Sequence, residues 1–212
     1  MSESYNHQIL KLKAIEFLYQ IKKCRWVATE ITVGKFRYDI VGTDGFRIYI
    51  IEAKRSYNDF KKDCNNPEDI KNTIVEYKKL LKESGDTSYI DLIKKEKNKS
   101  IKFYNKMIFS LANECFIIAP QDIIKNDELP KGWGLIDDYL SIVVEAEKRA
   151  VDKKWIIKII GEIAKKHTKM YLKSIGVNFI GKKVVFPETL LLNEDKEIEK
   201  EEEDDEPADT DS

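Results

Sequence analysis

The chain has 212 residues, enough for one domain of up to roughly 200 residues with an appendage. Hydrophobic residues make up 42% of it and aromatic residues 10%, which excludes global disorder and a small disulfide-stapled domain. Its three cysteines are widely spaced and form no CxxC pair, which argues against a zinc site and a secreted disulfide framework. No apolar run approaches the roughly 20 residues that span a bilayer, and the first residues do not resemble a signal peptide. We therefore expect a cytoplasmic α/β protein with no membrane partner.

Charge is distributed unevenly along the chain. Residues 194–212 hold twelve acidic residues and two lysines, a net charge of −10, so residues 1–193 carry +9 of the total of −1. The acidic segment has almost nothing to bury and is predicted to be a disordered tail. The basic remainder is suited to binding a polyanion such as nucleic acid, although a lysine-rich surface that only keeps the fold in solution fits equally well.

The first part of the chain predicts one helix followed by three strands. Apolar residues among lysines recur at helical spacing, with Asn6 as the expected N-cap. β-Branched segments on both sides of Gly34 and Lys35 predict a hairpin, and a turn at Asp44 and Gly45 leads into an apolar strand. The expected elements are a helix at 7–23 and strands at 26–33, 36–42 and 46–54.

The second part of the chain alternates helical and strand patterns. Pro67 is well placed to open a helix, and Pro120 to stop a short buried strand. A basic helix near the end carries Trp155, Ile159, Ile163 and Met170 as an apolar stripe. The expected elements are helices from 67, at 101–113 and at 149–174, strands at 115–120, 134–136 and 140–146, and an exposed lysine-rich insertion near 84–100.

Asp39 lies near the end of the second predicted strand, and Glu52 and Lys54 lie at the end of the third. Positions 52 and 54 face the same side of a strand, and the turn between the strands lets Asp39 approach them. Two carboxylates suit Mg²⁺ or Mn²⁺, and a neighbouring ammonium can orient or deprotonate water beside a scissile phosphate. An ordinary Glu–Lys pair at a solvated strand end is the alternative, since 35% of the chain is charged.

The chain resembles the PD-(D/E)xK nuclease superfamily and, within it, the MmcB-like DNA-repair endonucleases. The resemblance covers residues 7–147, and Tyr38 occupies the position of the superfamily's nominal proline. It implies an α/β fold with a restriction-endonuclease-like core (α-β-β-β-α-β), in which helices flank a mixed central sheet. The segments that carry the resemblance are TEITVGKFRYDIVG, IIEAKRSYNDFKKD, ECFIIAP and LPKGWGLI.

This resemblance implies roles for particular residues. Asp39 and Glu52 would bind the divalent ion, the backbone carbonyl of Ala53 would complete its coordination, and Lys54 would act on the attacking water. Glu30 matches an acid before the hairpin that orients a metal-bound water or Lys54, with a solvent-facing residue as the alternative. Glu16 is a further acidic candidate, because members often add a glutamate on the first helix, although it also fits the polar face of that helix.

Other residues near the motif have two interpretations each. Ser56, Asp59 and Asp63 follow the family pattern, but shaping the turn into the next helix explains them as well as substrate contact does. Trp133 either stacks on a base or, as we favour, fills an edge of the core. His7 is expected to be exposed. Basic side chains beside the motif, which either hold phosphates or form a solvated face, are Arg37, Arg55 and Lys61.

We expect a nuclease-like domain at 1–147, a basic helical extension packed on it at 148–193, and the acidic tail at 194–212. The predicted function is Mg²⁺-dependent endonucleolytic hydrolysis of DNA, with Mn²⁺ able to substitute, in repair, recombination or mobile-element defence. RNA remains an alternative substrate, and cutting both strands with one site would require a homodimer or sequential nicking. The alternative function is a non-catalytic nucleic-acid-binding or recruitment module that keeps the nuclease fold.

Overall fold

The structure is a computed structural model that describes residues 4–33, 36–105, 107–180 and 183–185. The expected turn at Gly34 and Lys35 and the acidic tail at 194–212 lie outside the described residues. The chain divides into two compact units, Met1–Ile163 and Ala164–Ser212, so the boundary falls inside the last helix. The first unit contains every residue of the predicted nuclease motif.

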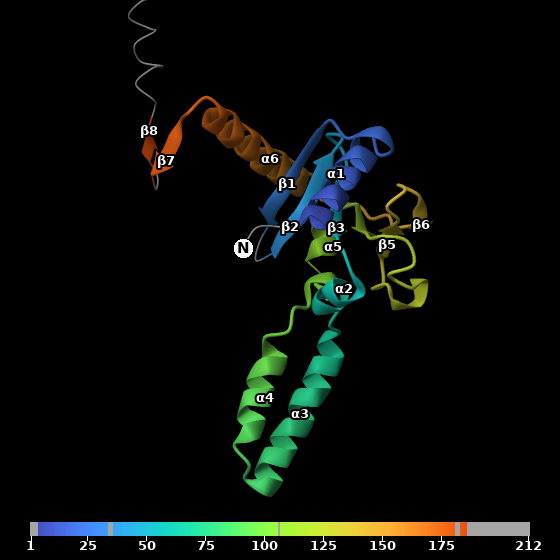
Figure 1. The fold of residues 1–212 in the computed structure, drawn as a ribbon, viewed down its shortest axis with the longest axis vertical. Coiled ribbons are helices and arrows are strands. Elements are labelled where there is room, and N and C mark those ends of the chain that lie inside the picture. The colour runs from blue at the N-terminus through green and yellow to red at the C-terminus, as the bar shows by residue number, and fades with distance from the viewer. Residues whose placement is uncertain (1–3, 34–35, 106, 181–182, 186–212) are drawn as a thin grey trace, which may run out of the picture. The chain divides into compact units, whose positions relative to one another are not determined.

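A six-stranded mixed sheet forms the centre of the first unit, and its strands are neighbours in chain order (Figure 1). The first three strands are antiparallel, the next two are parallel to the third, and the last is antiparallel again. This sheet, with helices on both faces, confirms the expected α/β class. The strands are β1 (Trp26–Val33), β2 (Phe36–Thr43), β3 (Ile48–Ala53), β4 (Glu114–Ile118), β5 (Trp133–Ile136) and β6 (Ile142–Val144).

Helices precede, connect and follow these strands. Within the described residues, no helix is both long and apolar enough to cross a membrane. The helices are α1 (Tyr5–Gln20), α2 (Tyr57–Asp63), α3 (Pro67–Ser84), α4 (Ser88–Lys97), η1 (Lys102–Tyr104), α5 (Ile108–Leu111), η2 (Asn126–Glu128) and α6 (Lys153–Ser174).

The two faces of the sheet are covered by different helices. On one face α1 packs across β1, β2 and β3, with its buried side chains in one cluster with Ile40 and Ile51 (Figure 1). On the other face Phe60, Phe103 and Ile159 pack over the inner strands. Coverage on both faces explains why every residue of β3 and β4 is buried, since neither strand has a solvent-facing side.

Two local expectations were wrong, and a third holds in part. The N-cap of α1 is Ser4 rather than Asn6. Residues 84–100 are mostly exposed, as expected, but they include the helix α4, which packs against α3. The helix expected at 101–113 is broken into η1 and α5 because Phe103 turns into the core and the Asn105 side chain accepts the Met107 N–H, which begins a new turn.

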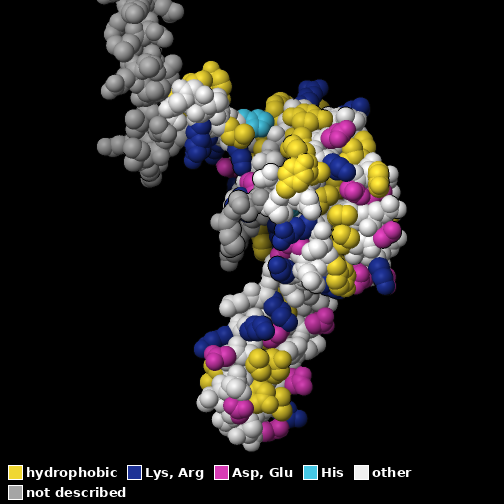
Figure 2. Space-filling view, in the orientation of Figure 1, with side chains coloured by type: hydrophobic (Ala, Val, Ile, Leu, Met, Phe, Trp, Pro, Cys, Tyr) yellow, Lys and Arg dark blue, Asp and Glu magenta, His cyan; other side chains and the backbone are white. Residues whose placement is uncertain are grey.

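The helical pair formed by α3 and α4 begins as the sequence predicts. Pro67 is the first helical residue, after the N-cap Asn66, and α3 ends at Gly85 in the left-handed conformation (φ 69°). No residue of α3 is fully buried, and Val75 and Ile90 are exposed. Figure 2 shows hydrophobic side chains gathered on the surface of this part of the molecule.

The predicted apolar stripe of α6 is confirmed for its first half. Ile159 and Ile163 are buried in the core of the first unit and Trp155 packs against it, whereas Met170 is 58% exposed. The second unit contains the end of α6 and an antiparallel hairpin that the sequence did not predict, β7 (Asn178–Ile180) and β8 (Lys183–Val185).

Candidate active site

The pairing of β2 with β3 places Asp39 opposite Glu52. Regular pairs run from Thr43 opposite Ile48 to Ile40 opposite Ile51, and the next step of this register joins the two acids. The Asp39 N–H donates to Glu52 Oε1 (3.3 Å), and the Ala53 N–H donates to Asp39 Oδ2 (3.0 Å). Each carboxylate is thereby held by a backbone amide of the neighbouring strand, which fixes the two carboxylates close together.

Glu30 lies opposite Asp39 on the other side of β2, at an irregular point in the sheet. It falls between the pairs Thr29–Ile40 and Ile31–Tyr38, and its φ is 57°, an unusual value for a residue other than glycine. The irregularity brings its carboxylate to two cations, Lys11 and Arg37. Lys11 lies close to both Glu30 and Asp39, so the two carboxylates share a cation. That Glu30 orients a metal-bound water or Lys54 stays a prediction.

Glu52 is buried, with its side chain 1% exposed, and its charge partner is a lysine that the sequence did not predict. Lys102 Nζ, from η1, lies 2.7 Å from Glu52 Oε2 and 5.4 Å from the centre of the Tyr38 ring. Lys102 stands among many lysines between residues 94 and 106, so the sequence carries no signal that separates it from them. Only the packing of η1 against the sheet identifies it.

Lys54 lies beside this pair, with its side chain 6% exposed. Its Nζ donates to Asp63 Oδ2 (2.7 Å) and lies 5.4 Å from the centre of the Phe103 ring. Asp63 at the end of α2 therefore holds the ammonium beside Glu52. The proximity of Lys54 to Glu52 that the D…ExK pattern predicted is present.

The electrostatic environment separates the pKa values of the two acids. Burial, and then the charge of Asp39, raises the pKa of Glu52 to about 8, although Lys102 and Lys54 act against this. Burial acts to raise the pKa of Asp39 as well, but His7, Lys102, the Ala53 amide and Lys11 outweigh it and hold that pKa well below its usual range. Asp39 is therefore ionised at neutral pH, while Glu52 binds a proton readily.

The pKa of Lys54 is raised. Burial acts to lower it, but the negative charges of Glu52 and Asp63 outweigh burial. Lys54 is therefore an ammonium at neutral pH, which favours orienting a water molecule or a phosphate oxygen over accepting a proton.

The first helix contributes His7 and Lys11 to the site, whereas Glu16 lies elsewhere. His7 Nε2 is 3.5 Å from Asp39 Oδ2 and Lys11 Nζ is 3.7 Å from Asp39 Oδ1. Glu16 is exposed and accepts a hydrogen bond from Gln20 (3.0 Å). The expected exposure of His7 was wrong because it lies one helical turn before Lys11, on the side of α1 that faces Asp39.

The residues after Lys54 have structural partners. Ser56 is the N-cap of α2 and accepts the Asp59 N–H (3.2 Å), which confirms the interpretation that it shapes this turn. Arg55 is exposed between β3 and α2. Lys61 lies 3.3 Å from Glu128, so its charge is already paired.

Trp133 belongs to the core, as favoured from the sequence. It is buried, its Nε1 donates to the carbonyl of Phe103 (2.9 Å), and the two rings meet edge to face at 4.8 Å. The same contacts hold η1, and with it Lys102, against the sheet.

Ion pairs link the ionisable side chains at this edge of the sheet. Four acids are joined in ion pairs with four bases. Within the described part of the chain, no three His, Cys, Asp or Glu side chains form a group that could hold a metal ion. The carboxylate oxygens of Asp39 and Glu52 are the hard donors that Mg²⁺ prefers. These two side chains therefore fit a divalent ion by their chemistry, although they are fewer than three. The acids are Glu30, Asp39, Glu52 and Asp63, and the bases are Lys11, Arg37, Lys54 and Lys102.

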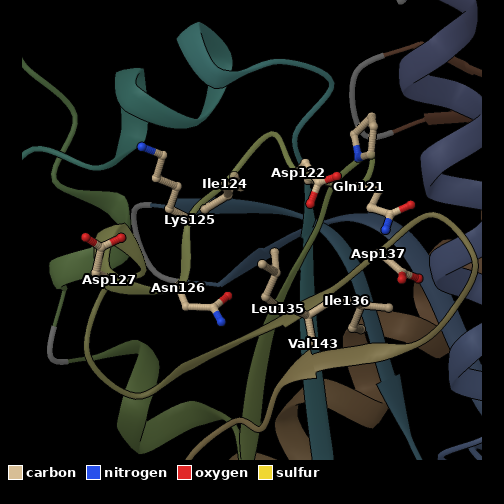
Figure 3. Close-up of a pocket in the computed structure, with 12 residues that line it drawn as sticks. Gln121, Asp122, Ile124, Lys125, Asn126, Asp127, Leu135, Ile136, Asp137 and Val143 are labelled. Carbon is tan, nitrogen blue, oxygen red and sulfur yellow. The ribbon is translucent and has the colours of Figure 1, made fainter.

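A separate cavity of about 630 Å³ opens where β4 and β5 end (Figure 3). Its lining includes the carboxylates Asp122, Asp127 and Asp137 and one ammonium, Lys125. None of the predicted site residues lines it. An acidic lining repels phosphate, so this cavity is not suited to hold the phosphates of a nucleic acid.

Comparisons with known proteins show the fold and nothing further. No protein-family model and no curated protein matches the chain. A solved structure of a protein of unknown function from Silicibacter pomeroyi, SPO1766, is similar, with a TM-score of 0.51 and 16% sequence identity. The similarity covers 81% of this chain and 92% of that chain. At this identity it shows that the two chains share a fold.

Proposed function

We propose that the protein is a metal-dependent nuclease with a restriction-endonuclease-like core, as in the PD-(D/E)xK superfamily. The observation that carries the proposal is the interlocked pair of Asp39 and Glu52, with the Lys54 ammonium beside it. Burying two like charges side by side is costly, and such clusters are found where a site performs chemistry. The pair lies at the carboxyl end of β3, the edge where α/β sheets commonly bind ligands.

In the proposed mechanism, Asp39 and Glu52 would hold the divalent ion with their carboxylate oxygens. Mg²⁺ bound there would supply positive charge to offset the charge that develops on the phosphate during hydrolysis. Lys54, fixed by Asp63, donates a hydrogen bond to the attacking water or to a phosphate oxygen. Glu52 and Asp39 accept hydrogen bonds from backbone amides, which keep the site rigid. The backbone carbonyl of Ala53 would be the third ligand of the ion.

DNA is the proposed substrate, and RNA is the alternative. The +9 charge of residues 1–193 supports a polyanionic partner. Of the cations near the motif, Arg55 has no ion pair with the described residues, whereas Arg37 and Lys61 are paired with Glu30 and Glu128. Arg55 is therefore the residue we propose to contact phosphate first.

A non-catalytic nucleic-acid-binding module is the second candidate function. The ion pairs of the site favour it, because each of the four acids already has a basic partner within the described residues. A cluster of this kind can serve only to hold β2, β3 and η1 together. Cleavage and binding assays separate the two candidates.

The test is cleavage of supercoiled plasmid and of labelled duplex, branched and single-stranded oligonucleotides with Mg²⁺ or Mn²⁺. Wild type is compared with Glu52→Gln and Asp39→Asn, which keep the shape of each side chain and remove its charge. Glu114→Gln is the matched control, because Glu114 is a buried glutamate in an ion pair at the other end of the sheet. We expect at least about 100-fold loss of cleavage in the two site variants and less than about threefold in the control.

Two results would contradict the proposal. Cleavage that survives in both site variants would place the active site elsewhere. Binding of DNA by folded wild type, with no metal-dependent cleavage of any substrate, would favour the non-catalytic module.

A further inference from the structure

The Lys102 ammonium lies against Glu52, the carboxylate that we propose to bind the divalent ion. The ammonium lies 2.7 Å from Glu52 Oε2 and 5.4 Å from the centre of the Tyr38 ring, and the side chain is 12% exposed. Lys54, the lysine of the motif, is directed instead to Asp63. The two lysines therefore have different partners, and only Lys102 hydrogen-bonds directly to a proposed metal-binding carboxylate.

The backbone of Lys102 is fixed by the residue that follows it. The buried Phe103 ring packs against Trp133 at 4.8 Å and Phe60 at 5.9 Å, and its carbonyl accepts the indole N–H of Trp133. The Lys102 side chain, by contrast, has rotatable bonds along its whole length and reaches the surface. Its ammonium can therefore leave Glu52 by rotation of the side chain while η1 stays in place.

We propose that Lys102 is a built-in competitor of the divalent ion, so that the ion binds Glu52 only when the Lys102 ammonium leaves it. This inference rests on the proposed metal-dependent function. An ammonium and a divalent ion repel one another strongly at the few ångströms that separate the ligands of one carboxylate in a buried site. The Lys102 ammonium occupies the place beside Glu52 and offsets the charge of this carboxylate until the ion displaces it.

The test is the affinity for Mn²⁺ itself, measured at pH 8.0 from the electron paramagnetic resonance signal of unbound Mn²⁺. Lys102→Met removes the competing charge and Lys102→Gln removes it while keeping a hydrogen-bond donor, so one of them serves if the other folds poorly. Lys99→Met is the control, because Lys99 pairs with the partly buried Glu96 (2.8 Å) three residues earlier in the chain. Circular dichroism checks that each variant is folded.

We expect Lys102→Met to bind Mn²⁺ about tenfold more tightly than wild type, Lys102→Gln at least about threefold more tightly, and Lys99→Met with unchanged affinity. Equal or weaker binding in both folded Lys102 variants, with binding by wild type that Glu52→Gln abolishes, would overturn this inference alone. No Mn²⁺ binding by any folded variant would overturn the proposed metal-dependent function and this inference together.

Discussion

Two buried Glu–Lys pairs lie at opposite ends of the central strands, and their surroundings differ. Glu114 begins β4 and pairs with Lys22 (2.5 Å), whose ammonium also lies over the Phe116 ring at 4.8 Å. Glu52, near the end of β3, is paired with Lys102 and also lies opposite a second carboxylate, Asp39. The pairs are alike in chemistry, so the difference between the ends lies in what surrounds each pair.

A buried ion pair by itself is weak support for either stability or function. At the Glu114 end, this carboxylate pairs with Lys22, and a second base, Arg47, lines the same pocket. At the Glu52 end, backbone amides hold two carboxylates side by side, an arrangement that suits a cation-binding site. The proposed function is therefore placed at the Glu52 end of the sheet, and a structural role is expected for the Glu114 end.

The largest expected difference is between the cleavage rates of two variants, each of which lacks a lysine at one end of the central strands. Lys54→Met removes the ammonium beside Glu52, and we expect it to reduce the cleavage rate by about 100-fold or more. Lys22→Met leaves the site intact, and its cleavage rate should stay within about threefold of wild type while the protein is folded. Equal losses in the two folded variants, measured under the same conditions, would remove the functional distinction between the two ends.

The next difference is in the free energy of unfolding. Lys22→Met leaves Glu114 as an unpaired buried carboxylate and should cost about 3 kcal/mol. Lys102→Met should cost only about 1 kcal/mol, because Lys54 remains near Glu52 and this carboxyl, with its raised pKa, takes up a proton. Urea titration at pH 7 measures both values, and a larger cost for Lys102→Met would show that its pair is chiefly structural.

The dependence of stability on pH tests the Glu52 end directly. A carboxyl whose pKa rises from about 4.5 to about 8 on folding binds its proton more tightly in the folded protein, so the free energy of unfolding falls as pH rises between these values. Removing this group in Glu52→Gln should flatten that fall by roughly 2–4 kcal/mol between pH 5 and 8. Asp39 and Asp63, whose pKa values are lowered, act in the opposite sense and below this range.

Urea titrations of wild type and Glu52→Gln at pH 5, 6, 7 and 8 give this comparison. Parallel curves for the two proteins would contradict the raised pKa of Glu52.

The smallest expected effect concerns Ser56, which lies near Glu52 and which we expect to have only a structural role. Ser56→Ala removes the N-cap of α2 and should cost about 1 kcal/mol of stability with less than about twofold change in cleavage. A much larger loss of cleavage in the folded variant would show that Ser56 contacts the substrate.

The sequence predicted the strands that carry the site because their signals are local. β1 coincides with the predicted segment, and alternation with an apolar centre was sufficient to place Asp39 and Glu52 on neighbouring strands, with Lys54 directly after the second of them. The expected position of Asp39 near a strand end was wrong, because β2 runs from Phe36 to Thr43 and Asp39 lies in its interior. The helix expected at 101–113 was wrong because a period of apolar residues does not reveal that Phe103 is anchored by a distant residue, Trp133.

Two of the cations at the site, Lys11 and Lys102, could not be predicted from the sequence. Lys102 and Lys11 contact carboxylates 50 and 19 residues away in the chain, so their roles depend on tertiary packing. With 37 lysines and arginines in the chain, composition gives no means of choosing among them. The spacing of His7 and Lys11, which are four residues apart, does indicate that the two side chains share one face of α1.

The most direct test of the central claim is the position of Mn²⁺ in crystals of the protein grown or soaked with this ion, located by its anomalous scattering. The account predicts a peak bound by the carboxylates of Asp39 and Glu52, with the Lys102 ammonium no longer on Glu52. A peak elsewhere, or crystals in which Lys102 stays on Glu52 and no ion binds the pair at saturating Mn²⁺, would contradict it.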